Sequence, residues 1–112
     1  MGEIVTRHDV GRRTVLRVDG EVDIATSPEL ATAIDRAFSG GASELWIDLS
    51  YTAFLDSSGI HALFQGEHRA RELNRTLVVI CPSGPVRRVL ELTGMLDHFA
   101  VYEDRDAAHR AA

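Results

Sequence analysis

The sequence predicts one α/β domain, in which three to four helices pack on a mixed β-sheet whose central strands are parallel. Two observations lead to this prediction. Short apolar segments alternate with amphipathic segments in the order ββαβαβαβ, with room for a final helix, as expected for right-handed β–α–β crossovers. The chain has 112 residues, 45% of them hydrophobic, which matches the size and core of one domain spanning residues 1–112.

The first two predicted strands form a hairpin. Residues 3–8 make one strand, 9–11 the turn, and 13–18 a second strand in which polar and apolar residues roughly alternate. A helix is predicted over 28–39, because Ser27 offers an N-cap, a proline occupies the first helical position and two glycines follow its end.

A buried strand is predicted at 45–49, followed by a loop at 50–55. Because Trp46 alternates with the apolar residues of this strand, its ring is expected to pack under a helix layer on the opposite face of the sheet. A second helix is predicted to open near Ser57. Its expected buried stripe consists of Ile60, Leu63, Phe64, Ala70 and Leu73.

The remaining segments repeat the strand-to-helix pattern. Residues 76–81 form a continuous apolar run that is typical of a parallel strand covered on both faces, and a helix follows from 85 until Gly94 ends it. Residues 99–102 make a last strand. The tail, 104–112, is predicted to be at most a short, frayed helix.

Composition excludes several classes of function. Twelve arginines, no lysine and seventeen acidic residues give a net charge of −5, so an acidic chain with dispersed basic residues is a poor nucleic-acid binder. No apolar run approaches the ~20 residues of a membrane span, so membrane insertion is not expected. Cys81 is the single cysteine. With no signal peptide at the amino terminus, we expect a cytoplasmic protein, and the lack of lysine points to a bacterial source.

Polar residues gather in two turns at the carboxyl ends of strands, around 20–27 and 51–59. The second turn contains Asp56, Ser57 and Ser58 at a helix start, where backbone N–H groups and the helix dipole converge. Helix capping explains one such side chain. Because the turn has more polar side chains than one cap needs, we expect a solvent-accessible hydroxyl that serves in docking to a partner.

Three segments resemble the signature of a known family. They are Asp-Leu-Ser at 48–50 with Phe-Leu-Asp-Ser-Ser-Gly at 54–59, Gly-Glu-Val-Asp at 20–23 with Thr26, and Leu-Thr-Gly-Met-Leu at 92–96. Residues 4–103 are therefore similar to the anti-sigma factor antagonists, or anti-anti-sigma factors, of the STAS domain class.

The resemblance implies a regulator of transcription rather than an enzyme. In that family an anti-sigma factor, which is a serine kinase, phosphorylates the first serine after the motif's aspartate, here Ser57. The unphosphorylated form binds the anti-sigma factor and frees the sigma factor, and a phosphatase removes the phosphate. No cofactor or metal is implied. The expected partner-binding residues are Asp23, Thr26, Asp56, Ser57, Ser58, Gly59, Ile60 and His61.

His61 departs from the family pattern, which often has Gly-Leu-Gly where this chain has Gly59, Ile60 and His61. The departure bears on which partner is recognised rather than on the fold. As His61 lies one helical turn after Ser57, on the side away from the apolar stripe, it is expected to be exposed.

Other functions remain open at the level of sequence. The domain could serve inside a larger assembly, such as a lipid-transporter accessory subunit or a stress-signalling scaffold. It could bind a small ligand or nucleotide through the arginines at 87–88 beside a helix start. An enzyme would use Ser57 as nucleophile and His61 as base, but the turn lacks the G-x-S-x-G elbow. A metal site at His61, Glu67 and His68 fits no usual ligand spacing.

Overall fold

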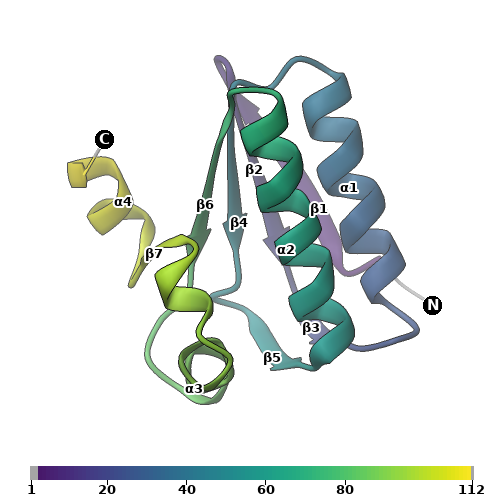
Figure 1. Cartoon of the computed structure of the whole chain (residues 1–112), viewed down its shortest axis with the longest axis vertical. Coiled ribbons are helices and arrows are strands. Elements are labelled where there is room, and N and C mark those ends of the chain that lie inside the picture. The colour runs from purple at the N-terminus through teal and green to yellow at the C-terminus, as the bar shows by residue number, and fades with distance from the viewer. Residues whose placement is uncertain (1–2, 112) are drawn as a thin grey trace.

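The main sheet has five strands in the order β1-β2-β4-β6-β7 (Figure 1). They are seen in a computed structural model that describes residues 3–111. The β1–β2 pair is antiparallel, and the other pairs are parallel, which confirms the predicted mixed sheet. The strands are β1 Val5–Val10, β2 Arg13–Val18, β4 Glu44–Asp48, β6 Thr76–Ile80 and β7 Ala100–Tyr102.

The first hairpin lies two residues later than predicted. The sequence placed the strand at 3–8 and the turn at 9–11, but β1 continues to Val10 and the turn is made by Gly11 and Arg12. Gly11 has φ +62°, which a residue with a side chain rarely adopts. The glycine therefore fixes where the chain reverses.

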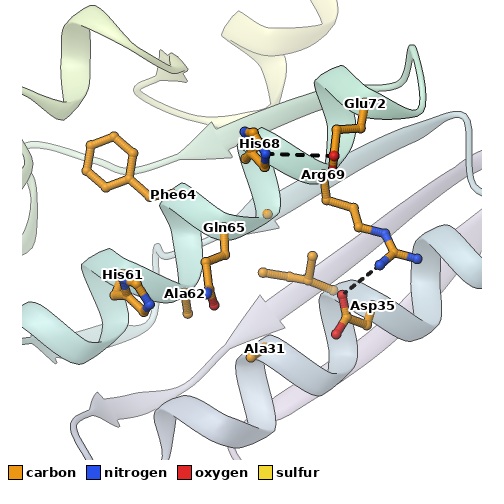
Figure 2. Close-up of a pocket in the computed structure, with 11 residues that line it drawn as sticks. Ala31, Asp35, His61, Ala62, Phe64, Gln65, His68, Arg69 and Glu72 are labelled. Atoms are coloured by element: carbon orange, nitrogen blue, oxygen red, sulfur yellow. Dashed lines mark ion pairs between the residues drawn. The ribbon is translucent and has the colours of Figure 1, made fainter.

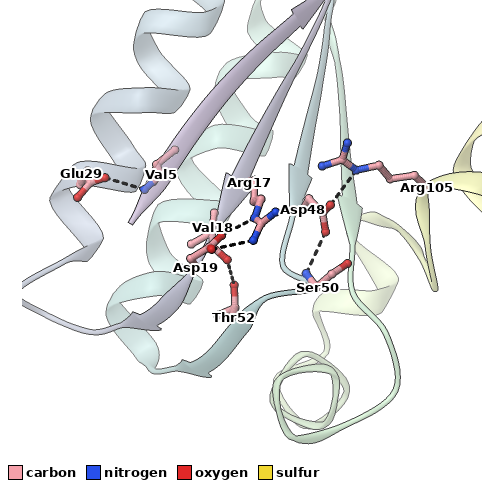
Figure 3. Close-up of polar contacts among 9 residues, drawn as sticks. All are labelled: Val5, Arg17, Val18, Asp19, Glu29, Asp48, Ser50, Thr52 and Arg105. Carbon is pink, nitrogen blue, oxygen red and sulfur yellow. Dashed lines mark hydrogen bonds and ion pairs between the residues drawn. The ribbon is translucent and has the colours of Figure 1, made fainter. Parts of the chain in front are cut away.

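A second, smaller sheet corrects the prediction of a loop over 50–55. β3 (Gly20–Val22) pairs in parallel with β5 (Thr52–Leu55). Neither strand was predicted, because each is very short and its only partner is distant in sequence. The buried Thr52 hydroxyl donates to the Val18 carbonyl oxygen at 2.8 Å, which fastens the start of β5 to the end of β2 (Figure 3).

α1 (Ser27–Ser39) and α2 (Ser57–Glu72) lie side by side on one face of the main sheet (Figure 1). α3 (Pro85–Leu92) adds Val86 and Leu90 to the same core, and a 3₁₀ turn follows at Met95–Asp97. The predicted stripe of α2 is partly wrong. Phe64 and Leu73 are 37% and 39% exposed. The Phe64 ring packs edge-on against His98 and Phe99, and Leu73 is the C-cap that follows the last helical residue.

The opposite face of the sheet carries a separate apolar cluster around Trp46, which is 1% exposed as the sequence predicts. This cluster is closed by α4 (Arg105–Ala111), whose Ala108 is buried. Arg105 Nε also donates to Asp48 Oδ2 at 2.8 Å (Figure 3). The helix is short, as expected, but a buried side chain and an ion pair hold it on the sheet.

Candidate functional site

The site begins at Asp56, which is the N-cap of α2. Its Oδ1 accepts hydrogen bonds from the backbone N–H groups of Ser58, at 2.9 Å, and Gly59, at 3.4 Å, and from the Ser58 hydroxyl, at 2.5 Å. The Ser58 hydroxyl, together with the two N–H groups, lowers the pKa of Asp56 below its ordinary value. At neutral pH the turn therefore holds a fixed negative charge at the positive end of the helix.

The two serines of the turn differ in what their hydroxyls do. Ser58 is half-buried and donates its hydroxyl to Asp56. Ser57 is exposed, and within residues 3–111 its hydroxyl has no hydrogen-bond partner. Ser57 is thus the accessible hydroxyl of the pair.

Gly59 and Ile60 were predicted to meet a partner, but both are buried. A Cβ on Gly59 would lie 2.3 Å from Leu55 Cδ1 and 2.8 Å from Val22 Cγ1, so only glycine lets α2 begin this close to the small sheet. These two residues lie beneath the exposed turn and position it.

The turn after β3 lies next to the start of α2, because the Asp56 N–H donates to the Val22 carbonyl oxygen at 3.1 Å. Asp23 Oδ1 accepts from the Ala25 and Thr26 N–H groups at 2.9 and 3.1 Å. The Thr26 hydroxyl donates to the Glu21 carbonyl oxygen at 2.8 Å. Asp23 and Thr26 therefore close their own turn, and the predicted meeting of the two turns is present.

Two exposed apolar side chains accompany these turns. Ile24 is 82% exposed between Asp23 and Thr26, and Phe54 is 49% exposed on β5, opposite Glu21 of β3. From the sequence, both Phe54 and Leu55 are expected to be exposed beside the turn; this is correct for Phe54 and wrong for Leu55, which is 2% exposed and packs under Gly59. Ile24 was missed, although an isoleucine within a polar turn is a signal that could have found it. Exposed apolar groups beside polar ones are typical of protein-binding surfaces.

His61 is exposed, as predicted, and lies at one end of a groove between α1 and α2 (Figure 2). The groove has a volume of about 530 Å³. Ion pairs flank its other end, where Arg69 lies 3.9 Å from Asp35 and His68 lies 3.8 Å from Glu72. In the part of the chain that the structure describes, no three His, Cys, Asp or Glu side chains are grouped to hold a metal ion.

The arginines considered for nucleotide binding lie at the start of α3. Arg87 Nη1 donates to the Cys81 carbonyl oxygen at 2.7 Å and lies 3.6 Å from Glu103. Arg87 thus joins the end of β6 to the end of β7, while Arg88 is exposed. The side chains of Arg87 and Arg88 therefore do not converge on one point.

Comparison with known proteins places the chain in a family. The STAS domain model matches residues 3–108. The chain belongs to the STAS domain family. The anti-sigma-B factor antagonist of Staphylococcus aureus (strain NCTC 8325 / PS 47) is 30% identical over 89 residues, which cover 79% of this chain and 82% of that protein.

Solved structures of anti-sigma factor antagonists have the same architecture. An anti-sigma factor antagonist from Mycobacterium paratuberculosis superposes with a TM-score of 0.87 at 30% identity, covering 96% of this chain and 91% of that one. The anti-sigma factor antagonist SpoIIAA in its unphosphorylated form gives 0.74 at 20% identity and 96% coverage of both chains. At that identity the second likeness concerns the fold alone.

Between residues 3 and 111, no helix combines the length and the apolar character that a bilayer span requires.

Proposed function

We propose that this STAS domain is an anti-sigma factor antagonist of the cytoplasm that binds a kinase-type anti-sigma factor while Ser57 is unphosphorylated. Binding releases the sigma factor. Phosphorylation of Ser57 by the anti-sigma factor ends the interaction, and a phosphatase restores it. The relatives named anti-sigma-B factor antagonist support the class of partner, and SpoIIAA, a Bacillus protein of the same fold, has a solved phosphorylated form.

The observation that carries this proposal is the difference between Ser57 and Ser58. Asp56 binds the Ser58 hydroxyl, whereas that of Ser57 is free and exposed at the start of α2. Phosphate adds about −1.5 to −2 charge at neutral pH. Placed beside the Asp56 carboxylate, it converts the surface around Ile24 and Phe54 into an anionic one.

The docking surface in this proposal consists of exposed side chains around the turn, and the residues buried under it keep its shape. A negative charge brought against an acidic partner surface costs several kcal/mol through repulsion. Against an apolar partner surface, the same charge is unfavourable because it loses its hydration. The helix N-terminus itself tolerates the added charge. Phosphorylation therefore blocks binding while the fold is unchanged.

The test is intact mass spectrometry after incubation with ATP and the anti-sigma factor that co-purifies from the native host. Wild-type protein should gain one phosphate, Ser57→Ala none, and Ser58→Ala one. A phosphate that persists on Ser57→Ala, or no phosphate on the wild type, would refute the proposed switch.

Binding of the same anti-sigma factor separates charge from shape. Ser57→Asp should abolish binding, while the uncharged Ser57→Asn should keep it and Ser57→Ala should bind constitutively. All three variants should melt like the wild type. If Ser57→Asp binds as tightly as Ser57→Asn, charge at this position is not the switch.

A further inference from the structure

The outer edge of β1 is open along most of its length. β1 has six residues, pairs with β2 without a bulge and contains no proline, so it lacks two of the usual features that protect an edge strand from pairing; the charged side chains of Arg7 and Asp9 are a third feature, which it retains. Residues 6–10 are exposed on both faces. The other edge strand of the sheet, β7, has only three residues.

Hydrogen bonds at the start of β1 show which backbone groups face outward. The Ile4 carbonyl oxygen accepts from the Asp19 N–H at 2.8 Å, on the β2 side. Glu29 Oε2, on the α1 side, accepts the N–H of Val5, the first residue of the strand, at 2.7 Å (Figure 3), and also the N–H of Ile4, which precedes the strand, at 2.8 Å. Successive residues of a strand direct their backbone groups to opposite sides.

The same alternation continues along the strand. The backbone groups of Thr6, His8 and Val10 therefore form hydrogen bonds with β2. The N–H and C=O groups of Arg7 and Asp9 point to the opposite side of the strand, where the sheet ends. Glu29 occupies the outward N–H of Val5, so the free stretch of edge is centred on His8.

We infer that this edge pairs with β1 of a second copy of the chain, in antiparallel orientation, with His8 opposite His8 of the other copy. In that register Arg7 of each copy lies opposite Asp9 of the other, and both residues use their outward backbone groups. Two identical strands paired in this way form a closed two-fold dimer with a continuous ten-stranded sheet.

Charge selects this register over its neighbours. Only residues whose backbone N–H and C=O groups face the second copy can form hydrogen bonds with it. One allowed register therefore differs from the next by a shift of the partner strand of two residues. The neighbouring registers set Arg7 against Arg7, or Asp9 against Asp9, and like charges directly opposite each other are unfavourable. A groove of about 380 Å³ between β1 and α1, lined by Arg7, Glu29 and Arg36 among others, leaves this edge accessible.

Sedimentation of the full chain over a range of concentrations tests the association, and the wild type should change from monomer to dimer. Asp9→Arg, which sets arginine against arginine, should weaken association by about tenfold. Arg7→Asp combined with Asp9→Arg restores opposite charges and should restore the dimer. A wild type that remains monomeric throughout, or a charge-reversed single variant that associates equally well, overturns the inference.

Disulfide trapping tests the register. In the inferred pairing the two His8 Cα atoms lie about 4.5 Å apart, which a disulfide can bridge. The two Thr6 Cα atoms are offset by four residues, roughly 14 Å along the strand. In a glutathione redox buffer, His8→Cys should form a covalent dimer and the matched exposed variant Thr6→Cys should not. Equal trapping of both variants overturns the register. Neither experiment depends on Ser57, so the proposed switch and this dimer can fail separately.

Discussion

At the scale of single residues, Asp56 distinguishes two adjacent serines. By accepting the Ser58 hydroxyl and two backbone N–H groups, it holds the first turn of α2 in place. The Ser57 hydroxyl is left exposed, without a hydrogen-bond partner among residues 3–111. One carboxylate therefore both caps the helix and determines which hydroxyl is available, which accounts for the number of polar residues in a turn that needs only one cap.

Asp56→Ala should lower the free energy of unfolding by about 0.5–2 kcal/mol, since it removes the N-cap of α2. Asp56→Asn should lose much less, because the amide oxygen still accepts the same N–H groups. Urea denaturation monitored by circular dichroism gives both values. Equal losses in the two variants would mean that the carboxylate acts through its charge rather than as a hydrogen-bond acceptor.

At the scale of elements, sequence periodicity predicted β2, β4, β6 and α2, because each buries most of its length or a long face that leaves a strong pattern. It missed β3 and β5, whose three and four residues show no pattern of their own. Nor could it place Gly59 beneath the surface, because that depends on contacts with Leu55 and Val22 from other elements. The meeting of the two turns was predictable, whereas the division of their residues into exposed and supporting ones was not.

α4 is the element that covers Trp46, so tryptophan emission should report on it. Trp46 is the only tryptophan, and its emission in the folded protein should be blue-shifted. Ala108→Asp places a charge in the buried contact and should shift the emission to the red. Ala111→Ser changes an exposed position of the same helix and should leave it unchanged. Identical spectra for all three proteins would show that α4 does not shield the ring.

At the scale of the whole molecule, stability should fall at both ends of the pH range. Hydrogen bonds hold the pKa values of the Asp9, Asp19 and Asp56 carboxyl groups below their ordinary values; the donors are Arg7 and Thr14 at Asp9, Arg17 at Asp19, and Ser58 with the Gly59 N–H at Asp56. Their stabilising contribution is present above those ordinary values and is lost as the pH falls through the lowered ones. Burial acts in the opposite sense on Cys81 and raises its pKa to about 11.

The folded state retains the Cys81 proton to a higher pH than the unfolded state does. The contribution of Cys81 is therefore complete below the ordinary thiol pKa of 9.0 and is lost as the pH rises towards about 11. Urea midpoints measured from pH 8 to pH 11 should decline, and Cys81→Ala should decline less steeply over the same interval. Parallel curves for the two proteins would show that the thiol does not contribute to the alkaline loss.

The position of α4 in the chain has a consequence for synthesis on the ribosome. Every strand of the main sheet precedes α4 in sequence, so the sheet can assemble while the face around Trp46, Val78 and Ile80 is still bare. Nascent chains with exposed apolar surface are prone to aggregate and to engage chaperones. Between the emergence of β7 and that of α4, this face of the newly made protein is open to such contacts.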